Sequence, residues 1–361
     1  MRTYRPLLAI LSFFLISSFA SAQSQLSVAP LPGDPMELVT GATHVPTTPQ
    51  EREQALNLLE RARQNADLHT PGAAPFILRV SFSASGNVLG TGSGEMEETW
   101  ISPQNGQWTA HLGNFAITRT LSQGLIFDDR QVTFIPIRLH MLRDALFWPI
   151  NFGAPGHILI RTANANWRGK EVTCIMTSGG MADPTPTPGR RWWEREFCVD
   201  PKTGLLQILS DAPGIYFVYD YTGGPQFHGR SVPKNISVFS AGKSVLEAHV
   251  ESMSDASNIT AESLASSNTP RRFGPVLSGA TRFPHIIHVA PGAATVQPVI
   301  VHAILDPKGE VMDAELIEMA DAALSQSALD IVKHTVFHRE EVRGGRMQTE
   351  AFINVQFVSG Q

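Results

Sequence analysis

The sequence lacks the motifs that usually identify an enzyme. It contains twelve histidines but no HExxH pattern, and its two cysteines are not spaced as CxxC. The glycine-rich stretch 90–94 has neither the GxSxG spacing of a nucleophile elbow nor the lysine of a phosphate-binding loop. We therefore expect no catalytic residue, no cofactor and no metal site. The contrasting hypothesis is a hydrolase, which would need a converging Ser/His/Asp or metal cluster among residues 76–250.

The sequence also lacks a large excess of either positive or negative charge. The formal net charge is −5, and neither a basic stripe nor an aromatic RNA-binding motif is present. Binding to nucleic acid depends on clustered lysine and arginine side chains that neutralise phosphates. We therefore expect no nucleic-acid partner.

Long apolar runs are missing after residue 22. At the N-terminus, Arg2 and Arg5 precede an apolar stretch of about fourteen residues, which is shorter than the ~20 that span a bilayer as a helix. Ala20 and Ala22 fit the small-residue pattern of a signal-peptidase cleavage site. We predict that residues 1–22 are a secretory signal and that the protein is periplasmic or otherwise exported within a bacterial cell envelope. If the signal is not cleaved, the protein would be anchored in the inner membrane.

The two cysteines are Cys174 and Cys198, and each lies in a strand-like segment. In an exported protein an even number of cysteines favours a disulfide bond. A Pro- and Gly-rich stretch, 177–190, lies between the two segments. We therefore predict a cross-strand disulfide that stabilises the fold by about 3 kcal/mol through loop closure.

Residues 48–253 have the rhythm of a meandering antiparallel sheet. Thr48 and Glu51 form a capping box with Pro49 at the first helical position, which predicts a helix ending near Asp67. From Phe76 onward, strand-like runs alternate with turn signals, interrupted by one amphipathic stretch at 138–147. With 25 prolines and 29 glycines, the sequence predicts an α+β protein that is mainly antiparallel β.

Two further stretches of this region suggest a family. The strand end at Glu97–Pro103 and the aspartate-marked turn at Phe197–Leu206 accompany the leading helix and the mid-chain helix. Together they resemble the LolA/LolB-like fold over roughly residues 50–253. The resemblance implies an open half-barrel and a periplasmic carrier of lipoproteins, other lipids or apolar ligands.

The C-terminal residues follow a ββαβ order. A β-branched run at Val299–Leu305 meets a Gly-containing turn at 306–309, a returning strand at 310–319, a helical pattern from 324 to 335 and an alternating strand at 351–357. This order, over residues 280–358, resembles the C-terminal domain of TonB-family proteins. Gly309, Ala328 and Phe337 fit the family pattern, whereas Thr335 and Arg339 replace its Trp and Pro. The resemblance implies a binding module.

The last strand is the predicted docking element of that module. An open sheet edge can bind an extended peptide through backbone hydrogen bonds. We expect Glu350, Phe352, Asn354 and Gln356 to form the peptide-docking strand for another envelope protein or a segment of an outer-membrane receptor. The alternative is an edge that faces solvent or pairs with a second copy.

These observations combine into one organisation. We predict a signal peptide (1–22), a flexible lead (23–47), a LolA-like β-rich domain (48–253), a linker (254–281) and a TonB-like domain (282–361). The function expected is a non-enzymatic docking protein that holds an apolar ligand or lipid in its large domain. The alternatives are an inner-membrane energy transducer of TonB type for transport across the outer membrane, and the periplasmic hydrolase.

Overall fold

The structure is a computed structural model, and it describes residues 36–70, 72–129, 132, 134–152, 155–179, 188–265, 276–289, 299–318, 322–337 and 347–359. The predicted signal and its cleavage site at Ala20 and Ala22 lie outside the described residues. Within those ranges no helix combines the length and the apolar character needed to cross a membrane.

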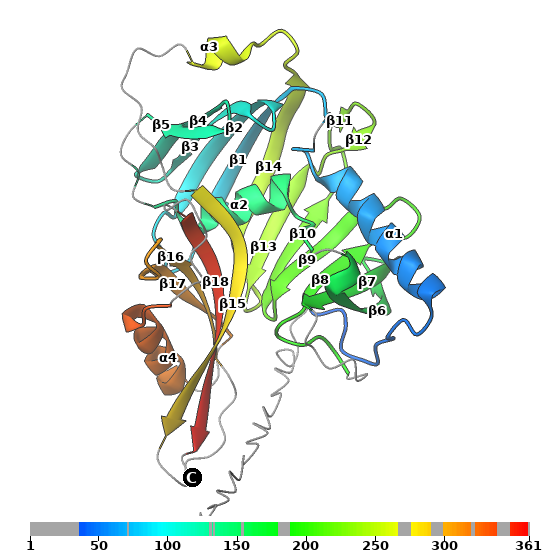
Figure 1. Cartoon of the computed structure of the whole chain (residues 1–361), viewed down its shortest axis with the longest axis vertical. Helices are drawn as coiled ribbons and strands as arrows, with labels where there is room; N and C mark the ends of the chain where they lie inside the picture. Colours follow the sequence, from blue (N-terminus) through cyan, green and yellow to red (C-terminus); the bar gives the residue numbers. More distant parts are fainter. Residues whose placement is uncertain are drawn as a thin grey trace, which may run out of the picture.

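One large, open antiparallel sheet dominates the molecule (Figure 1). Its twelve strands run in the order β5-β4-β3-β2-β1-β14-β13-β10-β9-β8-β7-β6, so two meanders are joined where β1 pairs with β14. Strands β5 and β6 form its two edges. The strands are β1 (Phe76–Ala84), β2 (Gly92–Ser102), β3 (Asn105–Leu112), β4 (Phe115–Ser122), β5 (Leu125–Asp128), β6 (Ile158–Trp167), β7 (Lys170–Gly179), β8 (Arg195–Val199), β9 (Leu206–Ala212), β10 (Ile215–Asp220), β13 (Asn235–Ser240) and β14 (Lys243–Asp255). A small hairpin, β11 (Gln226–Phe227) and β12 (Arg230–Ser231), stands apart.

Helix α1 (Pro49–Ala66) begins as the sequence predicts. The amide of Glu51 donates to Oγ1 of Thr48 at 3.2 Å, and Oε2 of Glu51 accepts from the amide of Thr48 at 3.2 Å. Two of the free amides at the helix N-terminus are thereby satisfied. The buried face of α1 joins the core that lines the inner side of the sheet.

Helix α2 (Ile137–Phe147) connects the two meanders and is buried on almost every side, Asp144 alone being half-buried. A helix buried all round needs partners on opposite faces. One partner is the large sheet, and the other is the C-terminal sheet, as Figure 1 shows.

The C-terminal sheet has four strands in the order β15-β18-β16-β17: β15 (Val276–Val289), β16 (Val299–Leu305), β17 (Val311–Glu318) and β18 (Met347–Ser359). Helix α4 (Ala322–His334) covers one face and shares a buried apolar cluster with these strands. A short helix, α3 (Ala261–Ala265), precedes β15. The four elements expected from Val299 onward are present in the predicted order. The structure adds β15, which pairs in parallel with β18.

The turn between β16 and β17 explains its glycine. The carboxylate of Asp306 accepts from the amides of Lys308 at 2.7 Å and Glu310 at 2.9 Å. Gly309 has φ +85°, and a Cβ there would collide with the carbonyl of Phe337. Only glycine combines this backbone conformation with such a close approach.

Two sequence expectations differ from the structure. Strand β18 is hydrogen-bonded to β15 on one side and β16 on the other, so the open edge expected there is occupied. Part of the expected flexible lead is also packed. His44 forms two backbone hydrogen bonds of 2.8 Å with Thr162 on β6, and Val39 is buried against the outer side of the large sheet. The boundaries predicted at residues 253 and 282 stay predictions, since β14 runs to Asp255 and β15 begins at Val276.

Candidate ligand-binding face and the docked C-terminal sheet

An aromatic group marks one end of helix α2. The ring of His69 stacks on Phe147 with centroids 4.3 Å apart and lies 4.9 Å from Trp148. Further aromatic rings continue inward, with Phe76 and Trp100 at 5.8 and 5.7 Å from His69. Trp148 is 42% exposed, whereas Phe76 is 1% exposed. A chain of contacting aromatic rings therefore leads from exposed Trp148 through His69 to buried Phe76.

Buried charges lie beneath this aromatic group. Nη1 of Arg143 donates to Oε2 of Glu98 at 2.5 Å, and Nε2 of His69 lies 3.2 Å from Oε1 of the same carboxylate. Burial lowers the pKa of His69, so its ring is neutral near pH 7. The guanidinium of Arg143 also stands 4.2 Å from the Trp108 ring centroid. The positive charge is balanced by Glu98, so this end of α2 presents apolar surface without a net charge.

The opposite side of α2 faces the C-terminal sheet. The guanidinium of Arg138 donates to both carboxylate oxygens of Glu315 on β17, at 2.6 Å each. Its Nε donates to the carbonyl of Ser85 at 2.9 Å. Arg138 is fully buried, and Glu315 is almost so. This bidentate ion pair joins the two sheets through the helix.

A buried histidine supports the same carboxylate. His302 on β16 lies between Glu315, at 3.1 Å from Nδ1, and Glu350 on β18, at 2.7 Å from Nε2. Hydrogen bonds and charge from the two carboxylates outweigh burial and raise the pKa of His302 to about 9. His302 and Arg138 hold the pKa of Glu315 down at about 2. His302 is therefore a cation near pH 7 and links two glutamates.

A carboxyl pair connects β18 back to α2. Asp144 forms a hydrogen bond with Glu350. Burial, together with the nearby carboxylates of Glu350 and Asp211, raises the pKa of Asp144 well above its usual range. This shift favours the protonated form of Asp144, which is the form that can donate a hydrogen bond to the Glu350 carboxylate.

Three further residues of the C-terminal sheet make polar contacts with the large domain. The side-chain amide of Gln348 accepts from the amide of Ile135 at 2.8 Å and donates to its carbonyl at 2.6 Å. The amide of Leu89 donates to Oδ2 of Asp313 at 2.9 Å. Arg282 on β15 donates to the carbonyl of Asp211. The C-terminal sheet is therefore seated on the large domain by several independent polar contacts.

The residues predicted as a peptide-docking strand share one face of β18. Glu350 is 2% exposed, and Phe352 and Asn354 are 0% exposed, while Gln356 is half-buried. Phe352 belongs to the apolar core of the large domain and stacks on the His302 ring, with centroids 4.8 Å apart. Glu350 and Phe352 thus contact the large domain of the same chain, through Asp144 and through the shared apolar core.

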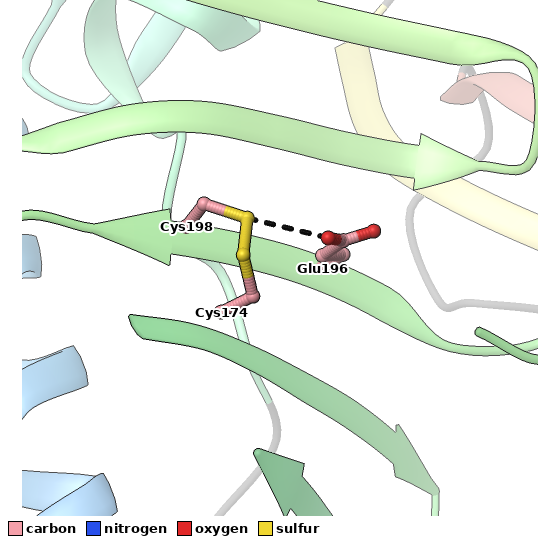
Figure 2. A group of neighbouring side chains, drawn as sticks. All are labelled: Cys174, Glu196 and Cys198. Carbon is pink, nitrogen blue, oxygen red and sulfur yellow. Dashed lines mark hydrogen bonds between the residues drawn. A yellow bond between two sulfur atoms is a disulfide. The ribbon is translucent and has the colours of Figure 1, made fainter. Parts of the chain in front are cut away.

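The predicted disulfide is present. Cys174 on β7 and Cys198 on β8 stand directly opposite each other, are fully buried and are joined by an S–S bond (Figure 2). Burial and the neighbouring glutamates raise the pKa of Glu196 to about 8. Because a disulfide sulfur carries no hydrogen, the protonated carboxyl of Glu196 is the donor in its 3.2 Å contact with Sγ of Cys198.

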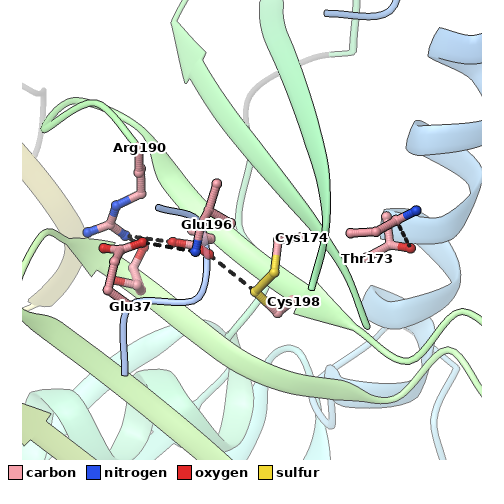
Figure 3. The surroundings of a disulfide bond; sticks show 9 residues. Glu37, Thr173, Cys174, Arg190, Glu196 and Cys198 are labelled. Carbon is pink, nitrogen blue, oxygen red and sulfur yellow. Dashed lines mark hydrogen bonds and ion pairs between the residues drawn. A yellow bond between two sulfur atoms is a disulfide. The ribbon is translucent and has the colours of Figure 1, made fainter. Parts of the chain in front are cut away.

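Polar residues surround this disulfide on the outer side of the sheet. Figure 3 shows Glu37, Arg190 and Glu196 beside it, with 3.7 Å between Nη1 of Arg190 and Oε2 of Glu196. Tyr216 donates to Oε2 of Glu37 at 2.5 Å. Cys174, Glu196 and Cys198 bring their ligand-type atoms within 4.8 Å of one another. The sulfurs are bonded to each other, so neither is a thiolate that could hold a metal.

Comparisons with known proteins return structural likenesses only. No protein-family model matches the chain. No curated protein matches it either. A LolA superfamily protein from Nitrosomonas europaea is similar over 56% of this chain and 93% of its own, with 11% identity and a TM-score of 0.37. A domain described as an outer membrane lipoprotein-sorting protein, from Vibrio parahaemolyticus, is similar over 58% of this chain and 97% of its own, with 8% identity and a TM-score of 0.36.

A third likeness covers more of this chain and less of its counterpart. MucB, in its complex with MucA, is similar over 62% of this chain and 62% of its own length, with 12% identity and a TM-score of 0.22. At these TM-scores and identities the likenesses are limited. The TonB-type resemblance of the C-terminal residues finds no support in a family model.

Sequence reasoning missed the groups that join the two sheets. Arg138 and Asp144 are two of four polar residues of α2, and the helical pattern does not distinguish them from His140 and Arg143. One signal was available. The run Val299–Leu305 is apolar at every position except His302, and it is buried along its whole length. A strand that is apolar without alternation is covered on both faces.

Proposed function

We propose that this protein is an exported, non-enzymatic binding protein that holds an apolar chain, such as a lipid acyl chain, at the aromatic group beside helix α2. The observation that carries the proposal is the series of contacting aromatic rings that leads from exposed Trp148 through His69 to buried Phe76. Small-molecule sites are mostly apolar and aromatic, with a few placed polar groups. His69, with its neutral ring at the centre of the group, supplies such a polar atom.

The test uses a fluorescent fatty acid and an exposed residue of the aromatic group. Trp148→Ser removes a ring at the solvent end and should weaken probe binding about 5- to 30-fold, the effect of losing one well-buried aromatic contact of about 1–2 kcal/mol. Leu125→Ser is the matched control, because Leu125 on β5 is an exposed apolar residue at 52% exposure. Equal binding by both variants and the wild type would place the ligand elsewhere.

A companion measurement uses the natural ligand. The protein is purified from its native envelope without detergent and analysed by native mass spectrometry, followed by lipid extraction. An added mass that is extractable as lipid supports the proposal. The same spectra report whether residues 1–22 are removed and whether the cysteines remain paired.

No specific observation favours the two alternative functions. The buried histidines His69, His140 and His302 contact glutamates or a glutamine, which is the pattern of structural polar contacts rather than of a nucleophile and its base. We therefore prefer the binding function to the TonB-type transducer and to the hydrolase.

A further inference from the structure

The backbone on both sides of His69 is held by one arginine. Arg230, on the small hairpin β11–β12, donates from Nη1 to the carbonyl of Asp67 at 2.5 Å and from Nη2 to Oγ1 of Thr70 at 2.9 Å. Phe227 of the same hairpin packs edge-on against a ring of the aromatic group, with centroids 6.2 Å apart. The hairpin therefore lies against this group and fixes the segment that carries His69.

The neutral imidazole of His69 carries its proton on one particular nitrogen. Burial lowers the pKa of His69, so one nitrogen bears a hydrogen and the other a lone pair. Nε2 lies 3.2 Å from Oε1 of Glu98. Although burial opposes its ionisation, the charge of Arg143 and the contact with His69 lower the pKa of Glu98, and an ionised carboxylate only accepts hydrogen bonds. The hydrogen is therefore on Nε2, and Nδ1 carries the lone pair.

Nδ1 is the nitrogen of His69 that is left for a ligand. Within the described part of the chain it makes no hydrogen bond. The side chain keeps 8% of its surface exposed, and Nε2 is buried, so Nε2 does not contribute to that exposed part. The polar atom that a ligand at the aromatic group can reach is therefore a hydrogen-bond acceptor.

The charges behind the ring disfavour an anion at this position. One oxygen of Glu98 approaches Nε2, and the other accepts from Nη1 of Arg143 at 2.5 Å, which neutralises the arginine. Nε of Arg143 is buried and cannot be reached from the exposed end. A carboxylate or phosphate at Nδ1 would lose water and meet a lone pair in its place, which is costly for a charged group. A neutral hydroxyl would supply the hydrogen that the lone pair lacks.

We propose that the ligand of the aromatic group is an apolar chain that ends in an uncharged hydroxyl, and that His69 selects this hydroxyl by accepting its hydrogen bond at Nδ1. This inference rests on the binding function proposed above and adds the chemical class of the ligand. Because Arg230 fixes the backbone beside the ring, the acceptor is already in position before the ligand binds.

Competition against the fluorescent fatty acid tests the selection. The competitors share one chain length and are dodecanol, dodecyl methyl ether and dodecanoate. At neutral pH, dodecanol should displace the probe at a concentration about tenfold lower than dodecanoate, because the anion loses water without gaining a donor. It should also act at a concentration about fivefold lower than the ether, which has the oxygen but no hydrogen to donate. Equal displacement by the alcohol and the ether, or tighter binding of dodecanoate, would overturn the proposal.

His69→Phe tests the ring nitrogen itself. Phenylalanine keeps an aromatic ring in the group and removes Nδ1, so dodecanol should lose its advantage over the ether, whose own affinity should change little. The matched control is His111→Phe. His111 on β3 is exposed between two buried neighbours and so points away from the core, and its replacement should keep the wild-type ratio. An alcohol advantage that persists in His69→Phe would overturn the role of His69.

The outcomes separate this inference from the binding function. If the probe binds the wild type and the competitors do not differ, the hydroxyl selection fails and the binding function stands. If the probe does not bind the wild type, both fail. Should His69→Phe not fold, the three competitors on the wild type still decide whether the site prefers a hydroxyl.

Discussion

Replacing Arg138 by methionine should destabilise the protein far more than its single position suggests. Methionine keeps much of the side-chain volume, so the change removes mainly the guanidinium and its two 2.6 Å hydrogen bonds to Glu315. The Glu315 carboxylate then stays buried without its principal partner. Removing one side of a buried ion pair costs about 3–5 kcal/mol.

The structure places the expected value at the lower end of that range. His302 remains 3.1 Å from the abandoned carboxylate and continues to compensate its charge. We therefore expect a loss of about 3 kcal/mol in the free energy of unfolding. Adding Glu315→Gln to Arg138→Met removes the uncompensated charge, so the double variant should recover about 1–2 kcal/mol relative to the sum of the single variants.

The assay is urea unfolding followed by far-UV circular dichroism. The matched control is Arg79→Met, which breaks the Arg79–Glu97 pair at the same 2.6 Å distance but with side chains 59% and 43% exposed. That change should cost less than about 1 kcal/mol, because water solvates the freed charge. Equal losses for Arg138→Met and Arg79→Met, or strict additivity in the double variant, would refute the reasoning.

Three other perturbations have defined outcomes. The folded-state pKa of His302 is about 9, above its unfolded value near 6.5, so its stabilisation is complete below pH 6.5 and is lost as pH rises through about 9. Urea titrations at pH 7 and pH 9.5 should therefore show lower stability at the higher pH, and a constant value would contradict the buried contacts of His302. Replacing Cys174 and Cys198 together by alanine opens a loop with a sequence separation of 24 and should lower the free energy of unfolding by about 3 kcal/mol. Thermal unfolding of the wild type with and without reductant is an independent check. Gly309→Ala combines a positive φ with a clash against Phe337. It should lower the melting temperature more than Gly242→Ala, where φ is also positive but no atom lies within 4 Å of the added Cβ. Similar melting temperatures for the two variants would show that the clash has no effect.

Local signals predicted the individual elements well. The capping box at Thr48 and Glu51, the run Val299–Leu305 and the Asp306–Gly309 turn each produced the element expected from them. These signals act within a few residues, where side chains and backbone decide the conformation. The cross-strand disulfide followed from redox compartment and strand pattern alone.

Pairings over long sequence distances were not predictable in the same way. Strand β15 contains Pro284 and two histidines, so its sequence does not read as a strand, and only its parallel pairing with β18 defines it. The alternation in β18 correctly grouped Glu350, Phe352 and Asn354 on one face. It could not identify what covers that face, because Asp144, the helical partner of Glu350, lies on a distant helix.

The pairing of β1 with β14 constrains the order of folding. Strand β1 has β2 as one neighbour and β14 as the other, so the two meanders become a single sheet only after Asp255 has joined the folded part. Until then β1 exposes an unpaired edge of nine residues, and such an edge can pair with another chain. Contacts between residues so far apart in sequence form slowly. While the chain folds, the first meander therefore passes through an aggregation-prone interval that ends when β14 pairs with β1.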